Sequence, residues 1–264
     1  MSKRISVVFG LAVVLSAWLP IFAADSPKTI RVLYDNYVFD QACGSDWGFA
    51  CLISGTEKTI LFDTGAKGDL LLANFEKMKL CPADVELAVI SHNHGDHTGG
   101  LLPFLATNEH VGVYLPAATP ASFVKETKAR AASVSVVNKP VEICKGVFVI
   151  GPLGDKIIEQ ALVVDTKKGL VIITGCSHPG VVAIAKKAKE HLGRNIFMVL
   201  GGTHLLNHTN EDLQRVVDDL KGMGIQKVGA THCSGDKAIA KMKEAFGDGF
   251  VRMGVGQVIE VVED

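Results

Sequence analysis

Residues 91–100, which read SHNHGDHTGG, bring three imidazoles and one carboxylate together directly after an apolar run. In an extended chain that leaves a strand, the side chains of His92 and His94 point to the same side, and Asp96 and His97 follow where the backbone turns over the end of the strand. This arrangement can hold two metal ions side by side. A surface cluster of histidines is the alternative, but the combination and spacing of these residue types favour a metal site.

The composition is typical of a globular protein without a basic surface. Of the 264 residues, 48% are hydrophobic and 21% are charged, which is enough to bury a large core in one domain. The formal net charge is −1 at pH 7, and no linker or block of like charges interrupts the chain. A nucleic-acid processing enzyme needs a basic face or an added domain, so we expect a small-molecule substrate and no nucleic-acid partner.

The N-terminal segment has the organisation of a secretory signal peptide. Two basic residues precede an uncharged run over residues 5–21, which small residues follow. We expect a signal peptide at 1–24, a mature domain at 25–264, and a periplasmic or secreted protein. Because Ile21 or Phe22 occupies a position where a small residue normally precedes the cleavage site, a retained N-terminal anchor is the alternative, and only then would the protein stay at a membrane.

Six cysteines are scattered along the chain without the spacing of a zinc finger. Cys43 and Cys51 flank a turn-like segment, and they are the pair that we expect if a disulfide forms. Cys81 and Cys144 are expected to be small buried side chains. The remaining two cysteines differ from these, because each lies close to a histidine in a glycine-flanked loop.

Short β-rich runs alternate with helical patterns along the rest of the chain. Strands are expected at 30–34, 49–54, 59–63, 87–90, 111–115, 133–137, 141–150, 161–165, 170–174, 196–200, 227–230 and 258–262. Helices are expected at 69–78, 100–106 and 179–192, and around the apolar stripes at 213–220 and 239–246. Strand-rich stretches with helices in both halves predict the α/β class, as two packed sheets covered outside by helices in a four-layer αβ/βα sandwich.

Three further histidines stand where a buried strand ends in a glycine-containing loop. They are His178 in GCSHPG, His204 in GGTH and His232 in THCSG. Loops at one edge of a sheet can hold ligands from distant parts of a chain, so we expect these side chains to converge on the cluster at 92–97. The alternative for each is an ordinary loop or core histidine. That alternative is our expectation for the remaining three: His110, His191 and His208.

These motifs together resemble the metallo-β-lactamase superfamily. The HxHxDH pattern at 92–97, Asp63 in LFDTG and the later histidine loops carry the resemblance, which spans about residues 30–262. The loops GCSHPG, GGTHL and HCSG are similar to those of the branch named for a dihydropterin ribofuranosylaminobenzene-phosphate synthase. Because the intermediates of that pathway are cytosolic, the export signal argues against inferring the substrate from the branch name.

The resemblance implies a dinuclear metal site. Its ligands would be His92, His94 and His178 for the first ion, and Asp96, His97 and His232 for the second. Imidazole and carboxylate ligands suit two Zn²⁺ ions best, with Mn²⁺ or Fe as alternatives. Asp63 would orient the histidine loop, although a role in a strand-end turn is also open. Cys176 stands where many members place a bridging carboxylate, so Cys176 is either a ligand or the neighbour of a bridging hydroxide.

The activity that the resemblance implies is metal-dependent hydrolysis. A metal-bound hydroxide would be the nucleophile, and Asp96 would orient it and accept its proton. His204 would contact the substrate or donate a proton to the leaving group. Phosphoesters, lactones and related small molecules all fit this chemistry. The alternatives are a metal-binding or sensing protein without turnover, and a β-lactamase, which the Cys176 loop disfavours.

Overall fold

Two mixed β-sheets form the centre of the molecule. The computed structural model describes residues 27–261, so the expected signal peptide lies outside the described residues. One sheet has, in spatial order, β13 (Val258–Val261), β1 (Lys28–Tyr34), β2 (Ala50–Ser54), β3 (Ile60–Phe62), β4 (Leu87–Val89), β5 (Gly112–Pro116) and β6 (Ser133–Val137). The other has β12 (Lys227–Thr231), β11 (Ile196–Gly202), β10 (Gly169–Thr174), β9 (Glu159–Thr166), β8 (Val147–Leu153) and β7 (Val141–Cys144).

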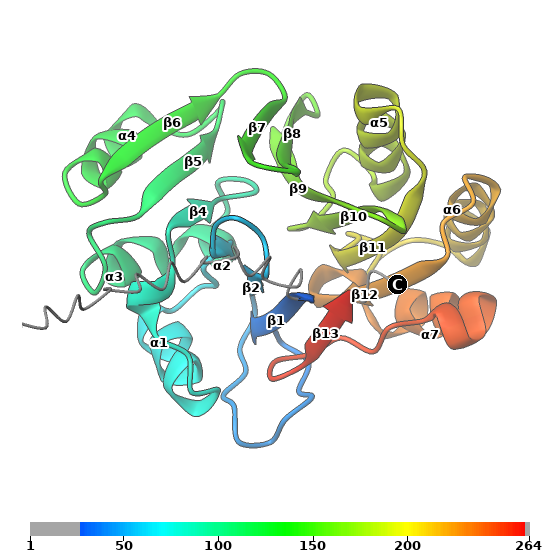
Figure 1. The fold of residues 1–264 in the computed structure, drawn as a ribbon. Coiled ribbons are helices and arrows are strands. Elements are labelled where there is room, and N and C mark those ends of the chain that lie inside the picture. The colour runs from blue at the N-terminus through cyan, green and yellow to red at the C-terminus, as the bar shows by residue number, and fades with distance from the viewer. Residues whose placement is uncertain (1–26, 262–264) are drawn as a thin grey trace, which may run out of the picture.

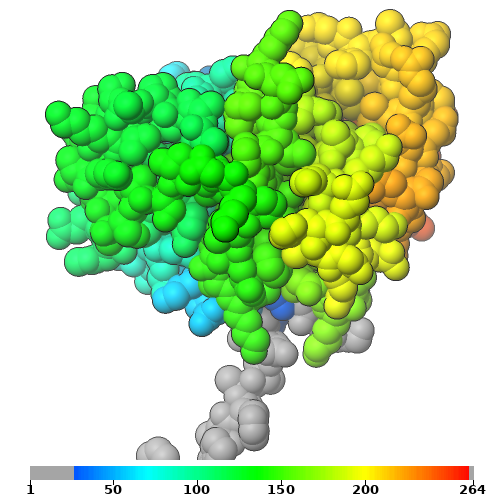
Figure 2. Space-filling view, turned by 90° about the horizontal axis from the view of Figure 1, so that it is seen from above, coloured from blue at the N-terminus to red at the C-terminus, as the bar shows by residue number. Residues whose placement is uncertain are grey.

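Helices cover the outer face of each sheet (Figure 1). The first sheet carries α1 (Gly68–Lys77), α3 (Leu101–Leu105) and α4 (Ala121–Lys128). The second sheet carries α5 (Val181–Leu192), α6 (Asn210–Gly222) and α7 (Asp236–Phe246). Seen from above, the two halves of the chain lie side by side (Figure 2). The molecule is therefore the expected four-layer αβ/βα sandwich.

Three layers of buried apolar side chains hold the sandwich together. The middle layer joins the two sheets, with Val32 of β1 and Leu162 of β9 in one cluster. One outer layer includes Leu71 of α1, and the other packs the α6 stripe, represented by Leu213, against the second sheet. Each such side chain contributes about 1.5–3 kcal/mol when it is fully buried, so the sheets are a rigid support for the loops at their edges.

Parallel pairing places the carboxyl ends of several strands at a common edge. In the first sheet β3, β4, β5 and β6 run parallel to one another. In the second sheet β10, β11 and β12 do the same. The histidine cluster follows β4, and the three later histidine loops follow β10, β11 and β12. Strand direction alone therefore gathers these loops at the carboxyl edges of the two sheets.

Three differences between the expected and the observed elements have a clear physical reason. The strand expected at 141–150 is a hairpin, β7 and β8, because Gly146 takes a φ of 71° in the turn. The helix expected from 179 begins at Val181, since Gly180 has a φ of 94°. Helix α4 was not predicted. Most of its residues are half buried or exposed, and Thr127 is its one fully buried residue. The sequence of this helix therefore carries only a weak apolar pattern.

Of the cysteine expectations, the one for Cys81 was wrong and the one for Cys144 was only partly met. Cys43 and Cys51 are buried, but all six cysteines of the described chain are free thiols. Cys81 is exposed because it precedes a single 3₁₀ turn at the surface. Cys144 is only half buried, since β7 is the edge strand of its sheet. Within residues 27–261, no helix combines the length and the apolar character needed to cross a membrane.

Candidate metal centre

The first group of ligand atoms comes from both sheets. His92 and His94 follow β4, while His178 follows β10, and their ring nitrogens lie within 4.8 Å of one another. Nε2 of His92 is 3.0 Å from Nδ1 of His94. Nε2 of His178 is buried and has no hydrogen-bond partner among the described residues. Three nitrogens that face one point, one of them without a partner, fit a bound cation.

The protonation states of this group also suit a metal. Burial lowers the pKa of His92 far below its ordinary value, and the neighbouring histidines lower it further. Burial, with His204 nearby, lowers the pKa of His178 to about 4. Both imidazoles are therefore neutral at neutral pH, which is the form that donates an electron pair to a metal ion.

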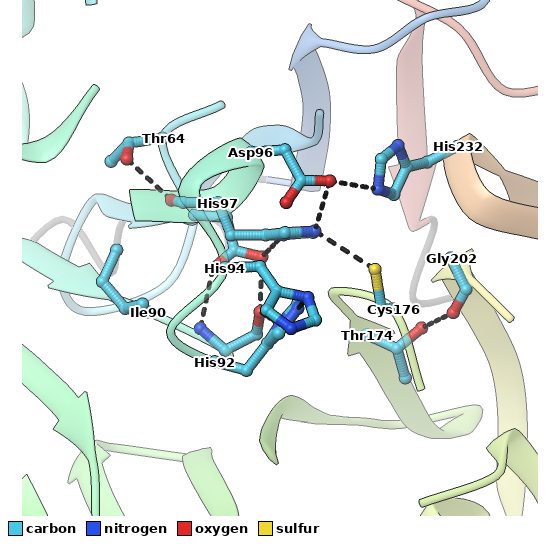
Figure 3. A network of polar contacts seen from close by, with 12 residues as sticks. Thr64, Ile90, His92, His94, Asp96, His97, Thr174, Cys176, Gly202 and His232 are labelled. Carbon is cyan, nitrogen blue, oxygen red and sulfur yellow. Dashed lines mark hydrogen bonds and ion pairs between the residues drawn. The ribbon is translucent and has the colours of Figure 1, made fainter. Parts of the chain in front are cut away.

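The second group comprises Asp96, His97 and His232, whose ligand atoms also lie within 4.8 Å of one another. Oδ2 of Asp96 is 3.3 Å from Nε2 of His232 and 3.7 Å from Nε2 of His97 (Figure 3). Burial alone would raise the pKa of Asp96, but the two histidines outweigh it and hold the pKa well below the usual range. Asp96 is thus an ionised ligand candidate at neutral pH.

Asp63 and Ser91 lie beneath both groups and connect them. Oδ2 of Asp63 is 2.7 Å from Nδ1 of His97 and accepts a 2.7 Å hydrogen bond from the Ser91 hydroxyl. The same Ser91 hydroxyl is 2.9 Å from Nδ1 of His92. Asp63 is fully buried and has a φ of 56°. One carboxylate therefore fixes a ring from each ligand group, which is the orienting arrangement expected of Asp63.

His204 lies at the entrance of the centre. Its ring centroid is 4.2 Å from that of His178, and its φ of 53° places it in the left-handed region. A hydrogen bond with Cys233 raises the pKa of His204 above its ordinary value. Its side chain is exposed, so it can reach a substrate. His232 shares the left-handed backbone, with a φ of 54°, and such conformations in non-glycine residues concentrate at functional sites.

A cavity of about 370 Å³ opens beside the first ligand group. His178 and His204 line it together with Val182 of α5 and Val216 of α6, and the charged residues Asp212, Arg215 and Asp219 of α6 line it as well. His208, for which no role was expected, also lines the cavity. This volume lies in the range of small-molecule sites, and the mixture of apolar walls with a few polar groups is typical of them.

Besides Ser91, Glu159 and Asn36 are supporting residues that were not predicted from the sequence. Glu159, at the start of β9, is fully buried and accepts hydrogen bonds from three consecutive backbone N–H groups, those of 176–178, at 2.7–3.0 Å. Asn36 places its Oδ1 2.9 Å from Nδ1 of His232. Neither Glu159 nor Asn36 belongs to a metal-ligand pattern in the sequence. For Glu159, the only sequence signal was a carboxylate at the start of an apolar run.

The structure brings together every side chain in the two expected ligand sets. Cys176 also joins them, because its Sγ lies 3.2 Å from Nε2 of His97. The three histidines for which no role was expected, His110, His191 and His208, belong to none of the ligand groups found among residues 27–261. His191 lies in the last turn of α5, where a cation suits the helix dipole.

The fold and these ligand groups define a metal-dependent enzyme, and comparison with known proteins gives its family. The chain belongs to the Metallo-beta-lactamase superfamily, whose family model matches residues 48–236. It is 28% identical to the 7,8-dihydropterin-6-methyl-4-(beta-D-ribofuranosyl)-aminobenzene-5'-phosphate synthase of Methanocaldococcus jannaschii, over 89% of this chain and 97% of that one.

Solved structures agree with this assignment. A metal-dependent hydrolase of the beta-lactamase superfamily is 29% identical, with a TM-score of 0.75 over 89% of this chain and 99% of that one. The metallo-beta-lactamase fold protein YhfI of Bacillus subtilis shares the fold, with a TM-score of 0.66 at 15% identity, over 89% of this chain and all of that one. The chain is accordingly a metal-dependent hydrolase or synthase of this superfamily.

Proposed function

We propose that the protein hydrolyses a small-molecule phosphoester, or a related ester such as a lactone, and that the two ligand groups would hold divalent cations that activate water for this reaction. One observation carries this proposal. Two groups of three ligand atoms, His92, His94 and His178 in one and Asp96, His97 and His232 in the other, converge on adjacent points beside an open cavity. A single structural ion would need only one of these groups.

The chain's own residues divide the catalytic work. Cations held by the two groups would lower the pKa of water and polarise the substrate oxygen. Asp96 is ionised and half buried, so it can orient the attacking water and accept its proton. His204, with a raised pKa and an exposed ring next to His178, is placed to donate a proton to the leaving group.

The cavity supports a substrate of modest size. Because His178 and His204 line the cavity, a scissile bond bound beside them would lie near the ligand groups, and the apolar part of the wall would receive the leaving group. The name of the Methanocaldococcus jannaschii relative denotes the synthesis of an aromatic ribosyl phosphate. Because the intermediates of that pathway are cytosolic and we propose export for this chain, the similarity supports the phosphoester class and not that particular substrate.

We also infer that the ions are Zn²⁺, because imidazoles dominate both ligand groups, with Mn²⁺ or Fe as the alternatives. At the N-terminus two basic residues are followed by an apolar run and then by small residues, and this order supports export to the periplasm or beyond. Cell fractionation with intact-mass analysis of the exported protein tests that part of the proposal. A mature chain that starts near residue 25 supports it, and a full-length cytosolic chain contradicts it.

Metal analysis and turnover of chromogenic substrates test the function. The purified chain is expected to hold two ions and to hydrolyse a chromogenic phosphodiester faster than a lactone or a β-lactam. His92→Ala and His178→Ala should lose metal, whereas His204→Ala should keep metal and lose activity. A chain that holds two ions and turns over none of the substrates would favour a sensing role. Full metal content in His178→Ala would contradict the assigned ligand set.

A further inference from the structure

His204 and His208 line two separate hollows. One is the cavity of about 370 Å³ described above, and the other, the smaller hollow, has a volume of about 160 Å³. These two histidines are the only residues that the linings of both hollows share. They therefore form a wall between the two spaces.

The two hollows border different ligand groups. His178 of the first group lines the larger cavity. The smaller hollow is lined by Trp47, whose ring centroid is 4.8 Å from that of His232 in the second group, and by Cys233, the neighbour of His232. A substrate that reacts at the ligand groups therefore has room for one substituent on each side of His204.

Two exposed apolar side chains line the smaller hollow. Trp47 is 46% exposed and Leu206 is 52% exposed. Single exposed apolar residues are ordinary, but two that line one hollow beside a reactive centre indicate a binding surface. A cavity of roughly 150 Å³ is enough to hold benzene, so the smaller hollow has room for one flat ring. An indole ring favours contact with such a ring.

The backbone holds both side chains in place. Gly48 has a φ of 144°, and a Cβ there would lie 2.5 Å from the carbonyl oxygen of Asp96. The Phe49 N–H donates to the same carbonyl at 3.3 Å, which fixes the segment that carries Trp47 beside the second ligand group. A Cβ at Gly235 would lie 2.9 Å from Cα of Leu206. The apolar surface is thus preorganised, which lowers the entropic cost of binding.

We propose that the substrate is a diester whose second organic substituent, a flat ring, binds between Trp47 and Leu206, while its leaving group occupies the larger cavity. This inference rests on the proposed hydrolase function and deepens it. A phosphate monoester carries one organic group, and a lactone joins both of its groups in one ring, so neither would fill two separate hollows. Trp47 and Leu206 then determine specificity for the group that is not released.

Two diesters with the same leaving group test this specificity. Bis(4-nitrophenyl) phosphate and methyl 4-nitrophenyl phosphate both release 4-nitrophenolate, and they differ only in the second substituent. The ratio of their kcat/KM values should fall by about tenfold in Trp47→Ala and about threefold in Leu206→Ala. The loss is expected in KM for the diaryl ester, with the methyl ester unchanged. Trp47→Phe should keep most of the ratio.

Phe39→Ala is the matched control. Phe39 is a 40% exposed aromatic residue of the same loop between β1 and β2, but it contacts Arg252 and lines neither hollow. Its removal should leave the ratio unchanged. Metal content is measured in every variant, because Trp47 also contacts His232. Metal loss, or an equal loss with both diesters, in Trp47→Ala would overturn the inference by showing that Trp47 only positions His232.

Leu206→Ala keeps the inference falsifiable if Trp47→Ala does not fold. Leu206 belongs to none of the ligand groups among residues 27–261, so its removal should alter the ratio without altering metal content. An unchanged ratio in Leu206→Ala would overturn the subsite.

Fluorescence separates this subsite from the hydrolase proposal. The chain has two tryptophans, Trp18 and Trp47, so the full chain with Trp18→Phe reports on Trp47 alone. Diphenyl phosphate should quench the zinc-loaded protein saturably, whereas dimethyl phosphate should not. Saturable quenching in a chain that hydrolyses nothing would keep the subsite and contradict the hydrolase. Hydrolysis of both chromogenic diesters without quenching would keep the hydrolase and overturn the subsite.

Discussion

Oδ2 of Asp63 lies 2.7 Å from Nδ1 of His97, and both side chains are fully buried. Burial alone would lower the pKa of His97, but Asp63 outweighs it and raises the pKa above its ordinary value. The contact leaves Nε2 of His97 free to face Asp96 and Cys176. Because Ser91 links the same carboxylate oxygen to His92, the orientation of both ligand groups depends on one residue.

Asp63→Asn tests this dependence. Oδ2 of Asp63 contacts His97 and the Ser91 hydroxyl, while Oδ1 accepts from the Ser91 backbone N–H. An amide offers one acceptor oxygen in place of two, so the contacts of one of these two oxygens must be lost. Zinc affinity is expected to fall by about 10–100-fold, as is typical when a partner of a ligating histidine is changed. Chelator competition measures the loss. Asp84→Asn, at an exposed carboxylate, should bind zinc as the wild type does, and an equal loss in both variants would contradict the orienting role.

Glu159→Gln addresses the loop that carries Cys176 and His178. The carboxylate accepts three backbone N–H groups, and burial raises its pKa. A glutamine NH₂ would oppose at least one of those N–H groups. The free energy of unfolding is expected to fall by about 1–3 kcal/mol, and zinc affinity to fall with it.

Denaturation curves and chelator competition measure the two effects of Glu159→Gln. Glu142→Gln is the matched control, since Glu142 is exposed and accepts a single backbone N–H, that of Gly146. A wild-type unfolding curve for Glu159→Gln would show that the three hydrogen bonds do not hold the loop.

The sequence predicted the parts of the site that follow from strand direction and ligand chemistry. His92, His94, Asp96 and His97 stand in one short segment, and His178 and His232 follow strands that run parallel to a neighbour. Periodicity and residue type are local signals, and they sufficed for these residues.

The supporting residues could not be predicted in the same way. Asn36 reaches His232 across 196 positions, and Glu159 reaches the 176–178 loop from a neighbouring strand of the sheet. Their roles arise from tertiary contacts, which no periodic pattern encodes. The wrong expectation for Cys81 has the same origin, because exposure at a surface turn depends on packing and not on the apolar character of a thiol.

Val216→Trp tests the cavity as the leaving-group site. The larger side chain would fill much of the space between α5 and α6, so kcat/KM for a bulky aromatic phosphoester should fall by about tenfold or more, while metal content stays unchanged. Steady-state kinetics with bulky and small leaving groups measures the effect. Val258→Trp, on the exposed side of β13, should leave kinetics unchanged. Equal rates for Val216→Trp and wild type would place the leaving group elsewhere.

Asp35 makes stability depend on pH. Burial raises its pKa from 3.8 to about 6, although Thr231 donates a hydrogen bond to it. The folded protein therefore holds this proton to a higher pH than the unfolded chain. Folding is favoured while Asp35 is protonated, so the free energy of unfolding falls as pH rises from about 4 to about 6, by roughly 3 kcal/mol in total.

Asp35→Asn should remove that part of the pH dependence, because the amide does not titrate. Urea denaturation of the metal-free protein at several pH values between 4 and 7 measures the difference from wild type. Asp155→Asn, at an exposed position, is expected to keep the wild-type pH dependence. If the free energy of unfolding changed with pH in the same way in wild type and Asp35→Asn, the Asp35 carboxyl would have the same pKa in the folded and the unfolded protein.

Gly175→Ala probes how closely the two sheets approach at the site. A Cβ at Gly175 would lie 2.1 Å from Oγ of Ser91 and 2.9 Å from Oδ2 of Asp63. The methyl group would push these atoms apart, and we expect the free energy of unfolding to fall by about 1–3 kcal/mol, together with weaker zinc binding. Gly222→Ala is the control: its Cβ would meet no described atom within 4 Å, and alanine there should leave stability unchanged or raise it by about 0.5 kcal/mol. The overlap at Gly175 involves Ser91 and Asp63, the two residues that orient His92 and His97. If Gly175→Ala were destabilised but bound zinc normally, close packing of the sheets at this point would not be needed to orient the ligands.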